Sequence, residues 1–522
     1  MYTTLVIMMA AAFTGKVMGL LRDRMMAVHF GTSSVEGIAF MQASVLPRQF
    51  LDIIFAAVFS ASFIPVFNEY LHTKGKQAAF DLASHFFIAV AVITTGLTVL
   101  FIGLSLPIYN VFLWNAAADP AVRDLGVQLL RVLFPLMILS GLAFSLASML
   151  QSLGNFNVPA AMSIVSNGVI LIYYVFFIER FGIYGLAVAF LLGWSGQVFI
   201  QMPFLIKQKF RFCKFPLRFW KHEGLRKIAS LALPVMVATW ALPVNLLVNG
   251  RASVGLYGGQ HGYVAINLAF TLYSIITGLF VLQLANFLLP QLSRLASAGN
   301  LEGFAAFMRS SFRQLMFLLL PMTFGLMAVA HPLVRLVFQD GAFQYESVEI
   351  TAAALFYFSI GTLGFGMQVI LNRGFFALQH SRAPLIAGGV AMIANLILSF
   401  VLAPVMEIGG PALASSSAMI ISAGLLFYLL RTKLAGLVFW SKDMTVDGLK
   451  MLGLSVMVFF AARGVLYVVE GWFIGDGLMM RIASVMLPAG AGVGIYVVGT
   501  FLFGVQESRS IAKFLYRKIY RR

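Results

Sequence analysis

The apolar segments of this chain form two matching series that lie about 225 residues apart. Because an internal repeat in a membrane protein typically builds two helical bundles around a central site, this pattern predicts two related lobes and alternating access, as in a transporter. Landmarks recur in the same order at offsets of 220–228 residues: Phe30-Gly31 with Tyr257-Gly258, Ile64-Pro65 with Leu289-Pro290, Ser140-Gly141 with Ile360-Gly361, Pro159 with Pro384, Asn167 with Asn395, and Leu186-Ala187 with Leu413-Ala414.

Composition supports a polytopic membrane protein. Hydrophobic residues make up 60% of the 522 residues and charged residues only 11%, with a mean hydropathy of +0.92, whereas soluble proteins carry about 25% charged residues. The single cysteine, Cys213, excludes a disulfide framework and a cysteine-based metal site. Met1 to Ala12 has no basic segment ahead of its apolar run, so we expect no cleaved signal peptide.

Windows of about 20 apolar residues mark the expected membrane spans. We predict an all-α polytopic membrane protein with about 14 transmembrane helices: two pseudo-symmetric six-helix lobes plus two C-terminal helices. The second and eighth windows are long for one span and are expected to be kinked or to extend beyond the bilayer. The predicted spans are 3–21, 36–68, 84–112, 126–151, 157–178, 184–206, 228–250, 262–293, 313–337, 349–372, 384–405, 411–431, 447–468 and 480–504.

The distribution of Lys and Arg predicts that both termini are cytoplasmic. With this orientation, about 25 of the 36 Lys and Arg residues lie in or beside cytoplasmic loops, as the positive-inside rule requires. The predicted parts are an N-lobe (1–206), a basic amphipathic cytoplasmic linker (207–227), a C-lobe (228–431), the last two helices (432–504) and a basic cytoplasmic tail (505–522).

Basic and aromatic residues alternate in the predicted linker between Lys207 and Lys221. This pattern favours a segment that lies on anionic lipid headgroups, with its rings at the apolar boundary. The net charge of +17 is therefore interpreted as a membrane-surface feature, with anionic membrane lipids as partners and no nucleic acid.

Several charged residues fall inside predicted spans, where a charge costs about 2.5–3.5 kcal/mol on insertion scales. In equivalent helices of the two lobes, they predict a cationic cavity that binds an anionic, phosphate-bearing substrate. The alternative is structural: Arg22 and Arg24 as interfacial anchors with Asp23 paired locally, and Arg48 with Asp52 as an ion pair. The candidate substrate-binding residues are Lys16, Arg22, Asp23, Arg24, Arg48, Asp52 and Arg251.

No pattern in the sequence indicates catalysis. Paired carboxylates, a Walker A motif and a Ser-His-Asp candidate in a large loop are missing, and no two histidines are spaced i, i+4. We therefore expect no enzyme activity, no cofactor and no metal site.

Several motifs resemble those of the MurJ (MviN) family of lipid II flippases. They are Gly19-Leu-Leu-Arg-Asp-Arg-Met-Met-Ala-Val-His-Phe-Gly31, Ala61-Ser-Phe-Ile-Pro-Val-Phe-Asn-Glu-Tyr70, Asn286-Phe-Leu-Leu-Pro-Gln-Leu-Ser293, Val337-Phe-Gln-Asp-Gly-Ala-Phe343 and Asn372-Arg-Gly-Phe-Phe-Ala-Leu-Gln-His-Ser-Arg-Ala-Pro384. The resemblance runs from about residue 10 to 435. It implies the multidrug/oligosaccharidyl-lipid/polysaccharide exporter fold and a bacterial cytoplasmic (inner) membrane protein.

The resemblance also implies a substrate and its partners. The substrate is lipid II, the undecaprenyl-pyrophosphate-linked precursor of peptidoglycan, which agrees with the predicted cationic cavity; cell-wall synthesis proteins are possible partners. In the family, helices thirteen and fourteen form a groove for the lipid tail.

The chain departs from the family pattern at several charged positions. Lys16 replaces a family arginine, which keeps the charge but loses the bidentate fork. A family arginine pair in helix two aligns with Leu51 and Asp52, and a nearby glutamate aligns with Ala56. An Asp-Arg pair expected in helix eight aligns with Phe270 and Thr271. These departures leave open a flippase for another lipid-linked glycan or an amphiphile, and a non-transporting cell-wall scaffold.

Overall fold

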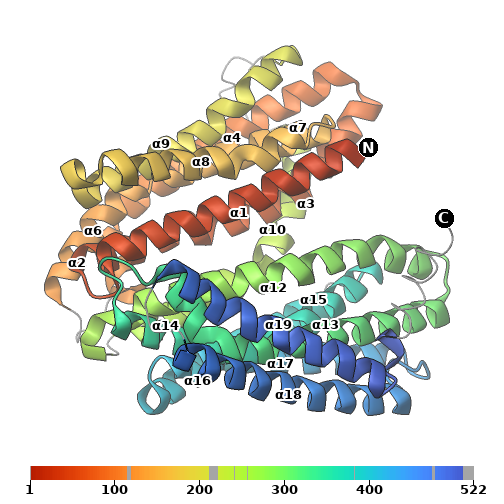
Figure 1. Cartoon of the computed structure of the whole chain (residues 1–522). Helices are drawn as coiled ribbons and strands as arrows, with labels where there is room; N and C mark the ends of the chain where they lie inside the picture. The colour runs from red at the N-terminus through yellow and green to blue at the C-terminus, as the bar shows by residue number, and fades with distance from the viewer. Residues whose placement is uncertain are drawn as a thin grey trace. The chain divides into compact units, whose positions relative to one another are not determined.

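The structure is a computed structural model that describes residues 2–113, 119–210, 222–239, 241–254, 257–380, 382–472 and 477–508. Every regular element in this part of the chain is a helix. The chain folds into two compact units, Met1–Val264 and Ala265–Arg522 (Figure 1). The prediction of an all-helical polytopic membrane protein is confirmed.

The first unit contains eleven α-helices, one π-helix and the beginning of α12. Their bounds are α1 (Tyr2–Phe30), α2 (Val35–Ser44), η1 (Val45–Phe50), α3 (Leu51–Thr73), α4 (Lys76–Gly103), α5 (Ser105–Phe112), α6 (Pro120–Leu133), α7 (Leu136–Ser152), α8 (Asn157–Phe176), α9 (Ile178–Lys207), α10 (Glu223–Thr239), α11 (Ala241–Ser253) and α12 (Tyr257–Ser297).

A π-helical turn interrupts the long second predicted span. The turn, η1, contains Pro47 and joins α2 to α3. Proline has no N–H to give to the helical ladder and its ring clashes with the preceding turn, so a helix commonly bends there. The second window is therefore interrupted by a π-helical turn, whereas the eighth lies within one helix, α12 (Tyr257–Ser297); the kinks or extensions expected of both windows stay predictions.

Two groups of helices pack within the first unit. The first group joins α1, α8 and α9, and the second joins α3, α4, α7 and α10. The second group shares an aromatic core in which Phe63 stacks on Phe86 with ring centroids 4.5 Å apart. The helices α10 and α11 belong to this unit, whereas the repeat predicts that the C-lobe begins at residue 228. The lobe boundaries stay a prediction.

The second unit contains the rest of α12 and seven further helices. They are α13 (Leu301–Phe338), α14 (Tyr345–Ile360), α15 (Thr362–Ala377), α16 (Arg382–Met406), α17 (Gly409–Lys433), α18 (Lys442–Trp472) and α19 (Leu478–Leu502). The last two helices form a pair that packs on α13 (Figure 1).

Ion pairs hold this helix pair to the unit at both ends. Arg313 of α13 pairs with Asp447 of α18, and its Nε donates to Glu507 at 2.7 Å. All three side chains are nearly buried, with exposed fractions of 11–14%. At the other end, Arg481 of α19 pairs with Asp340, 3.4 Å away, just after α13.

The described residues contain nine helices that are long and apolar enough to span a membrane, and ten if the bent pair α14–α15 counts as one span. These ten overlap ten of the fourteen predicted spans, with bounds that differ by up to about twelve residues. The other four predicted spans fall on α1, α2–α3, α10–α11 and α12, in which some side chains lie outside the described part of the chain. The count of fourteen therefore stays a prediction.

The internal repeat is visible in two helical hairpins, α8–α9 and α16–α17. In α8 and in α16 the landmark proline, Pro159 or Pro384, is the third residue of the helix, where its missing N–H costs no hydrogen bond. The landmark asparagines, Asn167 and Asn395, are buried on the same two helices.

Candidate substrate-binding site

The charged stretch of α1 is held against its own unit by Arg22. Its Nε and Nη2 donate to Oδ1 of Asp23 at 2.9 and 2.8 Å, and its Nη1 donates to Oδ1 of Asn167 on α8 at 2.9 Å. The guanidinium also lies 5.8 Å from the ring centroid of Phe190 on α9. Arg22 therefore bonds Asp23 within α1 through two of its N–H groups, bonds α8 through one, and contacts α9 through the ring of Phe190.

Asn167 connects Arg22 to the rest of this contact. Its amide nitrogen donates to the carbonyl oxygen of Gly15 at 3.3 Å and to the hydroxyl of Ser163 at 3.1 Å. Gly15 makes the close approach possible, because a Cβ there would lie 3.1 Å from Ser163. In the second unit, Asn395 accepts hydrogen bonds from Ser399 and from Ser415 of α17. Both landmark asparagines thus act as polar links between helices.

Lys16 and Arg24 lie on a different face of α1. They are eight residues apart, which at 3.6 residues per turn places their side chains about 80° apart around the helix. Lys16 is exposed and Arg24 is half-buried. Within the described part of the chain, no carboxylate pairs with Lys16. An exposed ammonium group on an apolar helix is costly in lipid, so this position fits contact with water or with an anionic ligand.

The remaining predicted site residues are placed less completely. Arg251 is half-buried in the last turn of α11, where a cation interacts favourably with the helix dipole. The side chains of Arg48 and Asp52 lie outside the described residues. The structure thus brings Arg22 and Asp23 together, whereas Lys16 and Arg24 point away from Arg22 around α1.

An aromatic side chain, Phe270 of α12, occupies one of the two positions where the resemblance predicts charges, and Thr271 occupies the other. Phe270 packs edge-on against Phe358 at 5.6 Å between ring centroids, and Tyr273 stacks on Phe358 at 5.8 Å. Phe270 and Tyr273 therefore form an aromatic cluster with Phe358 within the second unit.

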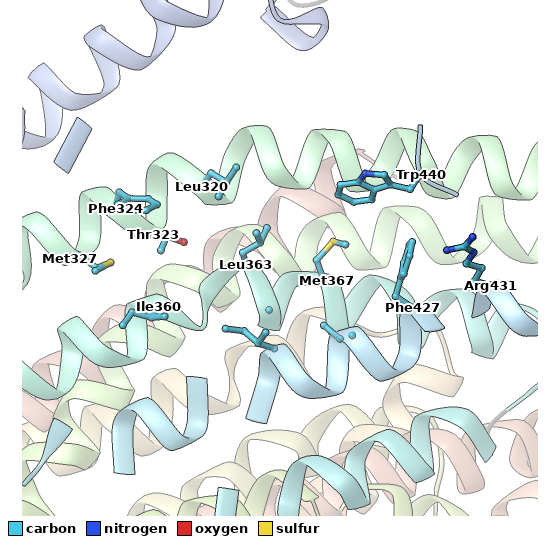
Figure 2. A pocket seen from close by; sticks show the side chains of 14 residues that line it. Leu320, Thr323, Phe324, Met327, Ile360, Leu363, Met367, Phe427, Arg431 and Trp440 are labelled. Carbon is cyan, nitrogen blue, oxygen red and sulfur yellow. The ribbon is translucent and has the colours of Figure 1, made fainter. Parts of the chain in front are cut away.

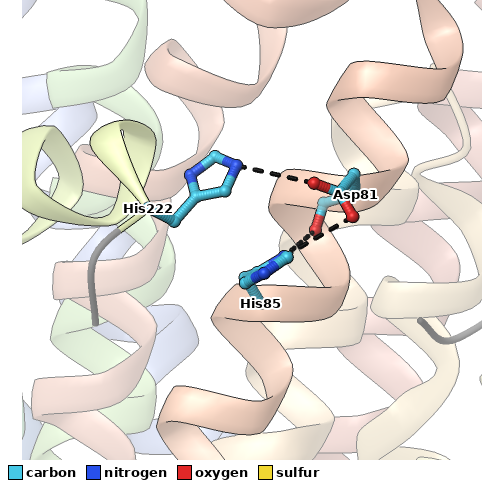
Figure 3. Close-up of side chains that lie close together, drawn as sticks. All are labelled: Asp81, His85 and His222. Carbon is cyan, nitrogen blue, oxygen red and sulfur yellow. Dashed lines mark hydrogen bonds and ion pairs between the residues drawn. The ribbon is translucent and has the colours of Figure 1, made fainter. Parts of the chain in front are cut away.

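A polar cluster that the sequence did not predict joins α4 to the residue before α10 (Figure 3). Oδ1 of Asp81 lies 3.6 Å from Nδ1 of His85, and its Oδ2 lies 3.6 Å from Nε2 of His222. Such a group could hold a metal ion. However, Nδ1 of His222 accepts a hydrogen bond from the N–H of Gly224 at 3.1 Å, so the proton of a neutral ring sits on Nε2 and faces Asp81. This tautomer favours an electrostatic contact over metal coordination.

Burial, and to a smaller extent the adjacent His85 and Lys74, lower the pKa of His222, while Asp81 opposes the shift. The neutral ring is therefore favoured near neutral pH. His222 lies 137 residues beyond His85 in the chain, so a search for neighbouring histidines in the sequence could not find the cluster.

Apolar helices in two compact units, many of them long enough to cross a bilayer, define a polytopic membrane protein. A family model described as "Lipid II flippase MurJ" matches residues 26–485. The chain belongs to the lipid II flippase MurJ family.

Relatives and solved structures agree with this assignment. A probable lipid II flippase MurJ of Rhizobium tropici is 25% identical over 97% of this chain and 95% of its own length. One from Vibrio cholerae is 28% identical over 81% of each chain. A structure of lipid II flippase MurJ in an inward closed conformation is similar, with a TM-score of 0.78 and 22% identity over 95% of this chain and 98% of that one. A MATE family transporter of the MOP superfamily, inward-facing, has a TM-score of 0.69 and 15% identity over 82% of this chain and 97% of that one.

Proposed function

We propose that this protein is a flippase that moves lipid II across the bacterial cytoplasmic membrane by alternating access, with both termini on the cytoplasmic side. Membership of the family supports the substrate class. The observation that carries the proposal at the site is Lys16, an exposed cationic side chain on an apolar helix. A pyrophosphate headgroup would stabilise this charge during passage, because an ammonium group without a partner is costly away from water.

Arg22 has a different role in this proposal. Its guanidinium is engaged with Asp23 and Asn167 inside the first unit, so it fixes the orientation of α1 and thereby the direction in which Lys16 points. Loss of Arg22 would disturb both packing and transport, and an Arg22→Ala variant would not separate the two effects. Lys16 is the sharper test.

The proposal can be tested by depleting the essential lipid II flippase of a host and expressing this chain. The periplasmic accessibility of lipid II is then measured directly. We expect rescue by the unchanged chain and by Lys16→Arg, and a strong loss with Lys16→Met. Lys433→Met, at the exposed end of α17, is the matched loss of one charge and should leave flipping unchanged. Equal flipping by Lys16→Met and the unchanged chain would refute the role of Lys16, and no flipping by the inserted, folded chain would refute the substrate.

A second candidate function is supported by the aromatic packing at Phe270. Where the family resemblance predicts an Asp-Arg pair, Phe270 and Phe358 form an apolar contact. An apolar position favours a headgroup with fewer charged or polar groups at that point, as in another lipid-linked glycan. Transport of such a lipid in the same rescue strain, without exposure of lipid II, would favour this alternative.

A further inference from the structure

An elongated apolar pocket of about 790 Å³ lies within the second unit, between α13, α15 and α17 (Figure 2). Met327 and Ile360 lie toward one end of the pocket, and Arg431 and Trp440 lie at the other. None of the described residues that line the pocket comes from α18 or α19, the helices to which the family resemblance assigns the groove for the lipid tail. The pocket is therefore separate from the predicted position of that groove.

The chemistry of the pocket is divided along its length. Arg431 is the one charged residue among the described residues that line the pocket, and it is exposed at the end of α17. Thr323, in the apolar part, already donates its hydroxyl proton to the carbonyl oxygen of Leu319 at 2.8 Å. The pocket therefore offers a cation at one end and almost no hydrogen-bonding capacity elsewhere.

Trp440 is positioned beside the cationic end. Its indole Nε1 donates to the hydroxyl of Thr445 at 2.9 Å, and its ring packs edge-on against Phe427 with centroids 6.1 Å apart. Tryptophan is enriched at the boundary between headgroups and hydrocarbon. Trp440 lies in the loop between α17 and α18, which the distribution of Lys and Arg predicts to be cytoplasmic.

The length of the pocket matches one leaflet of a bilayer. Ile420 and Arg431 line it from the same helix and are eleven residues apart, which corresponds to about 16 Å along an α-helix. Half of the hydrocarbon core is about 15 Å. A chain that begins at the headgroup boundary beside Arg431 would therefore reach the bilayer midplane near Ile420.

We propose that this pocket is a binding site for an anionic phospholipid of the cytoplasmic leaflet, with its phosphate at Arg431 and an acyl chain between α13, α15 and α17. Charge complementarity selects the headgroup, because Arg is well suited to phosphate and no lining carboxylate opposes it. The apolar lining favours an acyl chain, because binding buries the apolar surface of that acyl chain. The site does not depend on the identity of the transported substrate.

The purified full-length protein can be titrated with phosphatidylglycerol in detergent, and the bound lipid counted by native mass spectrometry. Arg431→Met should weaken binding at least about tenfold, because it removes a charge-assisted hydrogen bond. Lys433→Met, two residues further along the same helix and not part of the lining, is the matched control and should bind as the unchanged chain does. The zwitterionic phosphatidylcholine should bind more weakly than phosphatidylglycerol to the unchanged chain.

A second variant tests the apolar part of the pocket. A Cβ on Gly424 would meet no atom within 4 Å, so Gly424→Leu should fill the pocket without distorting α17 and should abolish the bound lipid. Brominated phosphatidylglycerol should quench the fluorescence contributed by Trp440, which is identified by comparison with Trp440→Phe.

Unchanged phosphatidylglycerol binding in both Arg431→Met and Gly424→Leu would overturn the proposal. So would a site that takes undecaprenyl phosphate and from which phosphatidylglycerol cannot displace it. If the flippase function failed in the rescue assay while Gly424→Leu still abolished lipid binding, the lipid site would stand independently.

Discussion

The ion-pair cluster of Arg313, Asp447 and Glu507 gives the sharpest prediction about what stabilises the second unit. Replacing Arg313 with Met keeps an apolar side chain of similar length but leaves two carboxylates, with exposed fractions of 14% and 11%, without their cation. Lys450 lies 3.7 Å from Asp447 but is itself more exposed, so it compensates only in part.

Breaking a buried ion pair on one side costs about 3–5 kcal/mol of folding free energy. For a unit of this size, at about 2 °C per kcal/mol, the melting temperature of the purified protein should fall by at least about 6 °C. The informative control is the triple variant Arg313→Met, Asp447→Asn, Glu507→Gln, which removes every charge of the cluster. Because a fully neutral cluster avoids the desolvation of unpaired ions, it should recover most of the loss.

Thermal unfolding in one detergent at one pH, followed by intrinsic fluorescence, measures all three proteins. A single variant that melts within about 1 °C of the unchanged chain would contradict the account. A triple variant that is as unstable as the single one would show that side-chain packing, and not unpaired charge, causes the loss.

Three further predictions concern the rest of the fold. The pKa of His222 is lowered in the folded protein, so the unfolded state binds more protons than the folded state as pH falls through about 6.5. The contribution of His222 to stability should therefore be complete above that pH and decrease below it. Melting measured between pH 5.5 and 7.5 should show a smaller pH dependence in His222→Gln. Asn167→Leu should lower the free energy of unfolding by about 1–3 kcal/mol, because Arg22 loses a buried hydrogen-bond acceptor. An unchanged melting temperature would exclude a stabilising role for this hydrogen bond. Gly410→Ala should lower the free energy of unfolding by about 1–3 kcal/mol or more, because its Cβ would lie 2.5 Å from the backbone carbon of Leu402. Gly453→Ala is the control: it has open space around it and should be neutral or slightly stabilising in the same assay.

The sequence predicts the helical class well because hydropathy depends on local composition. The windows at 447–468 and 480–504, for example, correspond to α18 and α19. The repeat landmarks Pro159 and Pro384 also recur at the same position of their helices. Helix class and helix position can therefore be predicted without knowing which segments are in contact in the folded protein.

Contacts between distant residues could not be predicted in this way. Arg22 and Asn167 were both singled out in the sequence, but their hydrogen bond joins positions 145 residues apart. Arg313 falls at the edge of a basic loop, and its partner Glu507 is 194 residues further on. The pocket beside Gly424 leaves no sequence signal, because small and apolar residues are ordinary in a membrane helix. These hydrogen bonds, ion pairs and the pocket depend on where side chains point in the folded protein, which composition does not determine.

Direct flipping by the purified protein tests the central claim most simply. The chain and its Lys16→Met and Lys16→Arg variants are reconstituted into vesicles that contain fluorescent lipid II, and the fraction reachable by a membrane-impermeant reagent is followed with time. We predict rapid exposure of the inner-leaflet lipid by the unchanged chain and by Lys16→Arg, and exposure close to protein-free vesicles by Lys16→Met. Exposure by the unchanged chain no faster than in protein-free vesicles, with the protein folded and inserted, would contradict the assignment of lipid II as its substrate.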